Sequence, residues 1–151
     1  MSDHPQPTAP VSVANPLTLM MKMKSPEDAK AVSDLVHALW SLPPDQNPVW
    51  VALNKLAIVH YARLVLFDDD TRMAIITTFD GTLDNYLNEF VNQLGDIFNE
   101  LLKHMEDAPP LPIQSNRKEF DEFVRMHNLE CVDFYSAYPT LTVLDIQAMQ
   151  G

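Results

Sequence analysis

The stretch that decides the fold is 58–79, which reads IVHYARLVLFDDDTRMAIITTF. Its two ends, residues 58–67 and 72–79, are rich in branched and aromatic side chains, which is the composition of central β-strands. Between them, Asp68-Asp69-Asp70-Thr71 predicts a polar tight turn. Two strands joined by so short a loop must run antiparallel, so this stretch predicts a β-hairpin within a sheet.

Upstream of the hairpin the sequence predicts a strand and then a helix. From Leu17 to Met23, apolar side chains recur at every second position, which is the period of a half-buried strand. Ser25-Pro26-Glu27-Asp28 has the features of a helix start: a capping side chain, a proline in the first turn, and acids at the positive end of the helix dipole. Pro43-Pro44 ends this helix. Residues 43–56 are expected to form a long connection, with or without a helical turn.

Downstream of the hairpin the sequence predicts its longest helix. This helix opens at Asp80-Gly81-Thr82, and apolar residues then follow at helical spacing from Leu83 to Met105. The remaining expected elements are, in order, a proline-rich linker at 108–112, a shorter helix capped by Ser115, a strand at 131–138 (CVDFYSAY), and a short helix or strand extension at 142–149.

The predicted order of elements, β, α, β, β, α, α, β, indicates an α+β protein with a ferredoxin-like βαββαβ plan, in which helices cover one face of an antiparallel sheet. Residues 1–15 are proline-rich and polar and are expected to form a flexible arm, and residues 16–151 to form a single domain. Apolar and aromatic residues occupy both faces of the hairpin strands, so the helices cannot cover all of them. Pairing of two sheets face to face would bury the remainder, which predicts a homodimer.

Composition and charge exclude several kinds of function. The net charge of −11 opposes binding to nucleic acid or to an anionic membrane, and the sequence contains no basic stripe. The single cysteine, Cys131, excludes an intramolecular disulfide and a CxxC motif. No apolar stretch reaches the roughly 18 residues that span a bilayer, and the N-terminus lacks the pattern of a signal peptide. A cytoplasmic location is therefore expected by elimination.

Several motifs resemble those of one known superfamily. They are the run 59–66 (VHYARLVL), the acidic turn after it, and Thr78-Phe79-Asp80-Gly81 followed by Tyr86-Leu87. These residues resemble the dimeric α+β barrel superfamily, and more narrowly uncharacterised bacterial members related to dye-decolourising peroxidases and small monooxygenases, with an HFAR…FDG…YL pattern. The likeness covers roughly residues 17–147. It implies a ferredoxin-like fold and a homodimer, but no single chemistry, because members of one fold differ in function.

The resemblance makes haem a candidate cofactor, although the motifs of the haem enzymes are missing. The peroxidase motif GxxDG is absent, because Ile76-Thr77 precede Asp80-Gly81 where that motif requires a glycine. No histidine matches the axial ligand of those enzymes. Peroxidase activity of that type is therefore not expected, and no catalytic residue is transferred from it.

His60 is the strongest candidate for a catalytic or ligand-binding residue. It lies mid-strand in an apolar run, on the face expected for Ala62, where burial favours a neutral imidazole suited to base catalysis or to ligation of a metal or haem. The alternative is a core histidine bonded to a carbonyl or carboxylate. Arg63, expected on the opposite face with Tyr61, is a candidate partner for a carboxylate or a haem propionate. Its alternative role is an ion pair across the sheet or at the dimer interface.

Aromatic side chains predict a ligand pocket, with ordinary core packing as the alternative. The predicted lining residues are Tyr61, Phe134, Tyr135 and Tyr138, with Trp40 and Trp50 as further candidates. No metal site is predicted, because one cysteine and the scattered histidines provide no ligand spacing.

Two functions remain open on the sequence. In the first, a small-molecule-binding protein or oxidoreductase-like enzyme holds haem or a small apolar or aromatic ligand in an apolar pocket, with His60 as base or ligand and Arg63 as anion partner. In the second, the chain is a non-enzymatic oligomerisation or protein-interaction module. A cavity of a few hundred Å³ with polar lining beside His60 would favour the first function. A fully packed His60 would favour the second.

Overall fold

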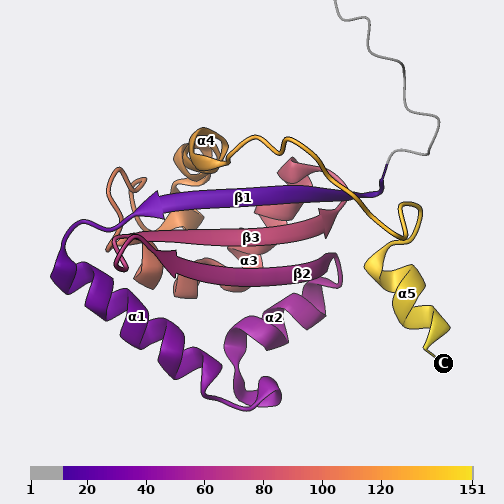
Figure 1. Ribbon diagram of the computed structural model, residues 1–151, viewed down its shortest axis with the longest axis horizontal. Helices are drawn as coiled ribbons and strands as arrows, with labels where there is room; N and C mark the ends of the chain where they lie inside the picture. The colour runs from indigo at the N-terminus through magenta and orange to yellow at the C-terminus, as the bar shows by residue number, and fades with distance from the viewer. Residues whose placement is uncertain (1–11, 151) are drawn as a thin grey trace, which may run out of the picture.

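The computed structural model describes residues 12–150 of the 151-residue chain. At the centre of this part lies a three-stranded antiparallel sheet in the spatial order β1-β3-β2 (Figure 1). The strands are β1 (Ala14–Lys22), β2 (Val59–Phe67) and β3 (Arg72–Asp80). The predicted hairpin is confirmed as β2 and β3, with Leu64 opposite Ile75. Because β1 pairs with the other edge of β3, β3 is the central strand.

The helices surround this sheet. They are α1 (Pro26–Trp40), α2 (Pro48–Leu56), α3 (Leu83–Leu102), α4 (Arg117–His127) and α5 (Val143–Met149), with 3₁₀ turns η1 (Pro44–Gln46) and η2 (Ile113–Ser115). Helix α1 begins as predicted, with the Ser25 hydroxyl accepting a hydrogen bond from the Asp28 N–H at 3.1 Å. Helix α3 is the predicted long helix and spans 20 residues. The N-cap position of α4 is Asn116, one residue later than the predicted Ser115, and its side chain makes no capping hydrogen bond.

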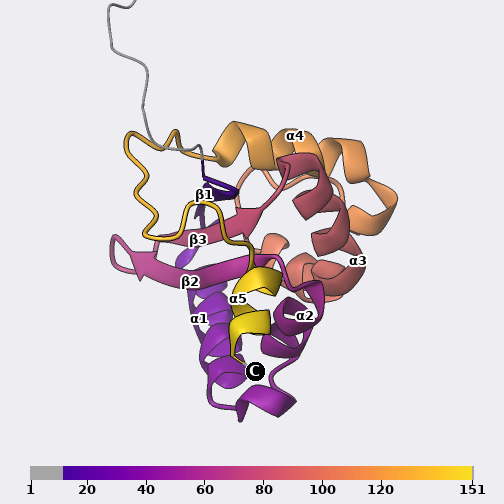
Figure 2. The same ribbon diagram turned by 90° about the vertical axis from the view of Figure 1, so that its right-hand side faces the viewer.

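Most of the helical mass lies on one side of the sheet. Figure 2 shows α3 and α4 to the right of the strands, with α1 and α2 below the β2 edge. The hydrophobic core forms between the sheet and α3 and α4, because each presents one apolar face. Its sheet residues include Leu17, Leu19, Met21, Met73 and Phe79, and its helix residues include Leu87, Val91, Phe98, Leu102, Phe120 and Phe123.

The opposite face of the sheet carries apolar side chains that remain partly accessible. Met20 and Val65 both lie opposite Ala74 in the two strand pairs, so they point to the same side as Ala74. Both are half-buried, as is Ile76 on the same face. Tyr61, also on this face, is 81% exposed. The helix-covered α+β arrangement is thus present, and the open face is the one on which the homodimer was predicted.

The predicted strand at 131–138 is not formed. The segment from Asn128 to Pro139 runs beside β1: the Leu129 N–H donates to the Thr18 carbonyl, and the Val13 N–H donates to the Pro139 carbonyl, both at 2.8 Å. Between these two contacts the side chains are too exposed for a half-buried strand, with Val132 at 98% exposure. A branched and aromatic composition predicted a strand here, but the segment lacks a buried face to stabilise one.

Two further elements differ from the simplest expectation. The connection at 43–56 contains a full helix, α2, because Pro48 occupies the first turn, where proline is tolerated, and the Asn47 side chain accepts a hydrogen bond from the Val49 N–H at 2.9 Å. Strand β1 begins at Ala14, inside the predicted arm, whose residues 1–11 lie outside the described part of the chain. Of the two possibilities for residues 142–149, the helix is correct.

Within residues 12–150 no helix has both the length and the apolar character needed to cross a membrane.

Candidate functional site

A cavity of about 300 Å³ lies at the end of the sheet where β1 and β2 begin and β3 ends. We call it the aromatic cavity. Its lining residues are Ala14, His60, Tyr61, Thr78, Phe134, Tyr135, Ser136, Ala137, Tyr138 and Ile146. The chain between α4 and α5 crosses this end of the sheet (right in Figure 1) and supplies the aromatic wall. The segment that was predicted to form a fourth strand therefore forms one side of the aromatic cavity.

The best-defined interaction at this cavity joins His60 to Asp80. The Nε2 of His60 lies 2.6 Å from Oδ1 of Asp80. The side chains of His60 and Asp80 are only 13% and 9% exposed. The second carboxylate oxygen, Oδ2, accepts a hydrogen bond from the Val143 N–H, the first residue of α5, at 2.8 Å. One buried carboxylate thus fixes the imidazole and the start of the last helix.

A β-bulge decides the direction of the His60 side chain. Two steps along β2, from Val59 to Tyr61, match one step along β3, from Phe79 to Thr78. His60 is the extra residue, and the normal alternation of faces is interrupted there. The expectation that His60 and Tyr61 lie on opposite faces is therefore wrong, since both line the aromatic cavity on the open side of the sheet.

The His60–Asp80 contact determines what the imidazole can do. In the neutral ring, a proton on Nε2 is donated to the Asp80 carboxylate, which leaves Nδ1 with a free lone pair. Within residues 12–150, Nδ1 has no hydrogen-bond partner. A histidine oriented by a carboxylate in this way is suited to accept a proton from a bound molecule.

Thr78 is a second polar residue of the cavity lining, but its hydroxyl is buried. Its oxygen is buried, and within residues 12–150 it has no hydrogen-bond partner. A buried polar group without a partner costs about 1–3 kcal/mol, so such groups are uncommon in folded proteins. Thr78 lines the aromatic cavity together with His60. Because its oxygen has almost no accessible surface, this hydroxyl does not face the cavity and is not itself a ligand contact.

The structure brings together most of the residues predicted for the site. His60, Tyr61, Phe134, Tyr135 and Tyr138 all line the aromatic cavity. Arg63 does not line it and is exposed further along β2. The alternative of a histidine bonded to a carboxylate is correct for His60, yet the same ring also borders a cavity.

Asp80 and Thr78 were missed by sequence reasoning. Asp80 was interpreted only as part of a helix start, although the hairpin register places the end of β3 beside the start of β2. An acid at the end of one hairpin strand and a histidine near the start of its partner are a readable signal. The bulge that brings them into contact was not predicted, because nothing in the composition of 58–62 marks it.

The geometry does not suit a haem ligated by His60. The Nε2 atom is held by Asp80 at 2.6 Å, so an iron there would have to displace a buried carboxylate. The other ring nitrogen, Nδ1, is bonded to the ring carbon that carries Cβ. A haem bound through Nδ1 would therefore collide with the backbone of β2. Among residues 12–150 no group of three or more histidine, cysteine or acidic side chains is placed to hold a metal ion.

Comparisons with known proteins give no relative from which a function can be transferred. No family model, no curated protein and no solved structure matches the chain. The assignment of a function therefore depends on the residues of the aromatic cavity.

Proposed function

We propose that this protein binds a small aromatic molecule carrying an ionisable hydroxyl group in the aromatic cavity, and that His60 accepts the proton of that group. The observation that carries the proposal is the His60–Asp80 pair, 2.6 Å apart, at the wall of a cavity of about 300 Å³. The proposal covers binding and proton transfer, and it includes no redox step.

The lining supports this ligand class. Phe134, Tyr135 and Tyr138 offer aromatic rings for stacking at the wall of the cavity. A volume of about 300 Å³ stands at the lower end of the range for small-molecule sites, so one or two rings fit better than a large cofactor. Arg63 keeps its predicted role as an anion partner only for a ligand that extends out of the cavity.

The superfamily assignment belongs to the same proposal. The strand order β1-β3-β2, with residues 128–139 beside the free edge of β1, is compatible with a ferredoxin-like sheet whose fourth strand is irregular. We infer membership of the dimeric α+β barrel superfamily, together with the cytoplasmic location expected from the sequence.

Titration with 4-nitrophenol tests the proposal, because the absorption of this probe near 400 nm reports its ionisation. The expected result is a saturable spectral change with one probe per chain, lost in His60→Ala. The matched control is His37→Ala, since His37 is an exposed residue of α1 far from the cavity. An identical titration of wild type and His60→Ala would refute the proposal.

A non-enzymatic oligomerisation module is the second candidate. The half-buried Met20, Val65 and Ile76 on the open face favour it, because a second copy would complete their burial. The two candidates are compatible, since the aromatic cavity opens on the same side of the sheet. A partner sheet would then border the cavity as well.

A further inference from the structure

Three of the four tyrosines of the chain lie at the aromatic cavity with most of their surface exposed. Tyr61, Tyr135 and Tyr138 line it, and they are 81%, 85% and 63% exposed. The fourth, Tyr86, is buried in the core. A small ligand inside the cavity would cover only part of the three exposed rings. A group of exposed aromatic side chains around a hollow is typical of a binding surface for a larger partner.

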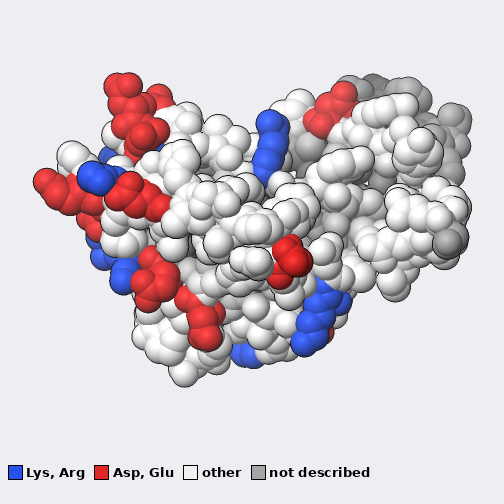
Figure 3. Space-filling view, turned by 90° about the horizontal axis from the view of Figure 1, so that it is seen from below, with Lys and Arg blue, Asp and Glu red and all other residues white. Residues whose placement is uncertain are grey.

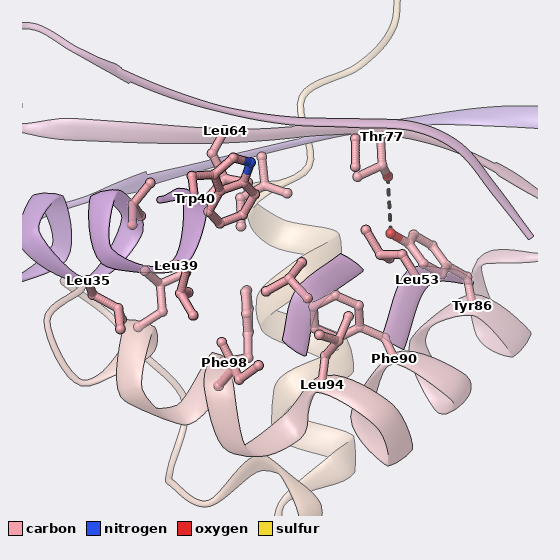
Figure 4. Close-up of a pocket in the computed structure, with 16 residues that line it drawn as sticks. Leu35, Leu39, Trp40, Leu53, Leu64, Thr77, Tyr86, Phe90, Leu94 and Phe98 are labelled. Atoms are coloured by element: carbon pink, nitrogen blue, oxygen red, sulfur yellow. Dashed lines mark hydrogen bonds between the residues drawn. The ribbon is translucent and has the colours of Figure 1, made fainter. Parts of the chain in front are cut away.

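The cavity on the helix-covered side of the sheet offers no such surface. Its free volume is only about 80 Å³, whereas an engineered cavity that holds one benzene molecule measures about 150 Å³. Figure 4 shows its side chains, including the predicted pocket residue Trp40, converging from the sheet and the helices. Its two hydroxyls satisfy each other, since the Tyr86 hydroxyl donates to Oγ1 of Thr77 at 3.3 Å. The aromatic cavity, at about 300 Å³, has more room for a ring.

The surroundings of the aromatic cavity carry little charge. No lysine, arginine, aspartate or glutamate is among its lining residues. Figure 3 shows few charged side chains at the end of the molecule where α5 lies (right), whereas acidic side chains gather toward the opposite end. A charged partner would find no complementary group at the exposed tyrosines. The partner that fits this surface is therefore uncharged and rich in rings.

The chain itself contains a segment of this chemistry next to the cavity. Residues 5–11 read PQPTAPV, with three prolines and no charged side chain. They come directly before the described part of the chain, and the start of that part is held at the cavity. The Val13 N–H donates to the Pro139 carbonyl at 2.8 Å, and Ala14 lines the cavity. Only three residues therefore separate Pro10 from the cavity lining.

A proline-rich segment suits exposed tyrosines for two reasons. Prolines favour the polyproline II conformation, so little conformational entropy remains to be lost on docking to an aromatic surface. Tyrosine rings pack against proline rings, and tyrosine hydroxyls can donate to the carbonyls that this conformation leaves free. At about 3.1 Å per residue, residues 5–10 extend over roughly 16 Å, which is long enough to cross the cavity.

We propose that residues 1–11 dock on the aromatic cavity of their own chain, with the prolines of residues 5–10 packed against Tyr61, Tyr135 and Tyr138. The docked segment covers the mouth of the cavity. A small ligand and the segment then compete for the same rings, so the segment regulates access to the site. This competition rests on the function proposed above, whereas the docking itself does not.

Serine substitutions in the full chain test the proposal, because they remove the rings and the conformational preference of proline. The test variant replaces all three prolines of the segment: Pro5→Ser, Pro7→Ser and Pro10→Ser. The matched control replaces the three residues between them and keeps every proline: Gln6→Ser, Thr8→Ser and Ala9→Ser. Both variants carry three changes in the same segment, and neither changes a residue of the helices and strands described above.

Aromatic NMR signals of the tyrosines report the docking without any ligand. We expect the signals of Tyr61, Tyr135 and Tyr138 to agree between wild type and control and to shift in the test variant. The signals of the buried Tyr86 should not change. Titration with 4-nitrophenol then measures the competition. The test variant should bind this probe at least about threefold more tightly than wild type, which corresponds to a segment that occupies the cavity about two thirds of the time.

Tyrosine signals that are identical in wild type and test variant would overturn the proposal. Shifts that appear instead at Met20, Val65 and Ile76 would place the segment on the open sheet face. A difference between the two proteins that disappears on tenfold dilution would assign the docking to a second copy. Either result would also overturn the proposal. If the tyrosine signals shift as expected but neither protein binds 4-nitrophenol, the docking is supported and the proposed function alone is refuted.

Discussion

At the scale of single residues, Asp80 connects three parts of the chain through one carboxylate. It accepts a hydrogen bond from Nε2 of His60 on β2, it belongs to β3, and it accepts another from the first N–H of α5. Asp80 itself is 7% exposed. A buried carboxylate persists only where hydrogen bonds compensate for its lost hydration. Its two partners provide this compensation, and in return they are held in fixed positions.

Replacement of Asp80 by Asn should therefore weaken both the fold and the site. The amide keeps the shape of the side chain but loses a charged acceptor, so we expect a loss of about 1–3 kcal/mol in the free energy of unfolding. Urea denaturation measures this loss. Asp34→Asn is the matched control, because Asp34 forms an exposed pair with Lys30, and such pairs contribute little. Equal stability of the two variants would contradict the structural role assigned to Asp80.

Tyr86 makes a prediction at high pH. Burial raises the pKa of its phenol above the ordinary value of about 10. The folded state then binds this proton more tightly than the unfolded state, so the stabilisation is complete below pH 10 and is lost as the pH rises further. Urea midpoints measured from pH 8 to 11 should fall more steeply for wild type than for Tyr86→Phe. Parallel curves would be inconsistent with a buried, neutral Tyr86.

At the scale of elements, α1 is anchored through its first turn. The Ser25 hydroxyl accepts from the Asp28 N–H and donates to Oδ2 of Asp28 at 2.6 Å. This hydroxyl and His104 lower the pKa of Asp28, with Ser25 the larger cause. The stabilisation by Asp28 is thus present above about pH 4 and is lost as the pH falls through its lowered pKa.

Ser25→Ala should remove the helix cap, and it should also weaken the dependence of the protein's stability on the ionisation of Asp28. We expect a loss of about 1 kcal/mol near neutral pH, which is usual for a helix cap. The difference from wild type should shrink as the pH falls below about 4, because protonated Asp28 no longer benefits from the hydroxyl. Thermal unfolding at pH 7 and pH 3 measures both effects. A difference that does not change between the two pH values would contradict the link to Asp28.

The elements that could be predicted from the sequence are those with a complete local signal. The hairpin of 58–79, the capped helix α1 and the wide apolar stripe of α3 each combine periodicity with a defined start or turn. The segment 131–138 had strand composition only, and its fate depended on whether a neighbour could cover it. Helix α2 was hidden by prolines that occupy permitted first-turn positions.

The candidate site was predictable in its residues but not in its geometry. Aromatic composition identified Phe134, Tyr135 and Tyr138. His60 was identified because it is a polar residue within an apolar strand. Their meeting depends on a bulge and on the path of an irregular segment, both of which are tertiary effects. Arg63 carried the same kind of signal as His60, and it lies on the same face as Tyr61, yet its place two residues further along β2, opposite Ile76, puts it outside the cavity lining.

At the scale of the whole molecule, the open sheet face remains to be accounted for. The chain has a net charge of −11, which favours solubility, yet this face carries Met20, Val65, Phe67 and Ile76 at intermediate burial. An apolar surface of this kind on a charged protein is typical of an interface. The predicted homodimer would bury it against the same face of a second copy.

Val65→Asp tests that homodimer. A carboxylate at the centre of the face would be buried twice in a symmetric pair, so the dimer dissociation constant should rise about thirtyfold or more, which corresponds to about 2 kcal/mol. Sedimentation equilibrium measures the constant. Val51→Asp is the matched control, because Val51 is 48% exposed on α2, away from the open face. A wild-type protein that remains monomeric at high concentration would refute the homodimer.

The central claim is that Asp80 holds Nε2 of His60 so that Nδ1 can accept a proton from a ligand. The most direct test is ¹⁵N NMR of the histidine ring nitrogens, recorded with and without saturating 4-nitrophenol. We predict that the free protein has the His60 proton on Nε2, and that the probe moves the Nδ1 resonance of His60 while the ring of His37 is unaffected. A His60 ring with its proton on Nδ1, or one whose resonances ignore the probe, would contradict the account.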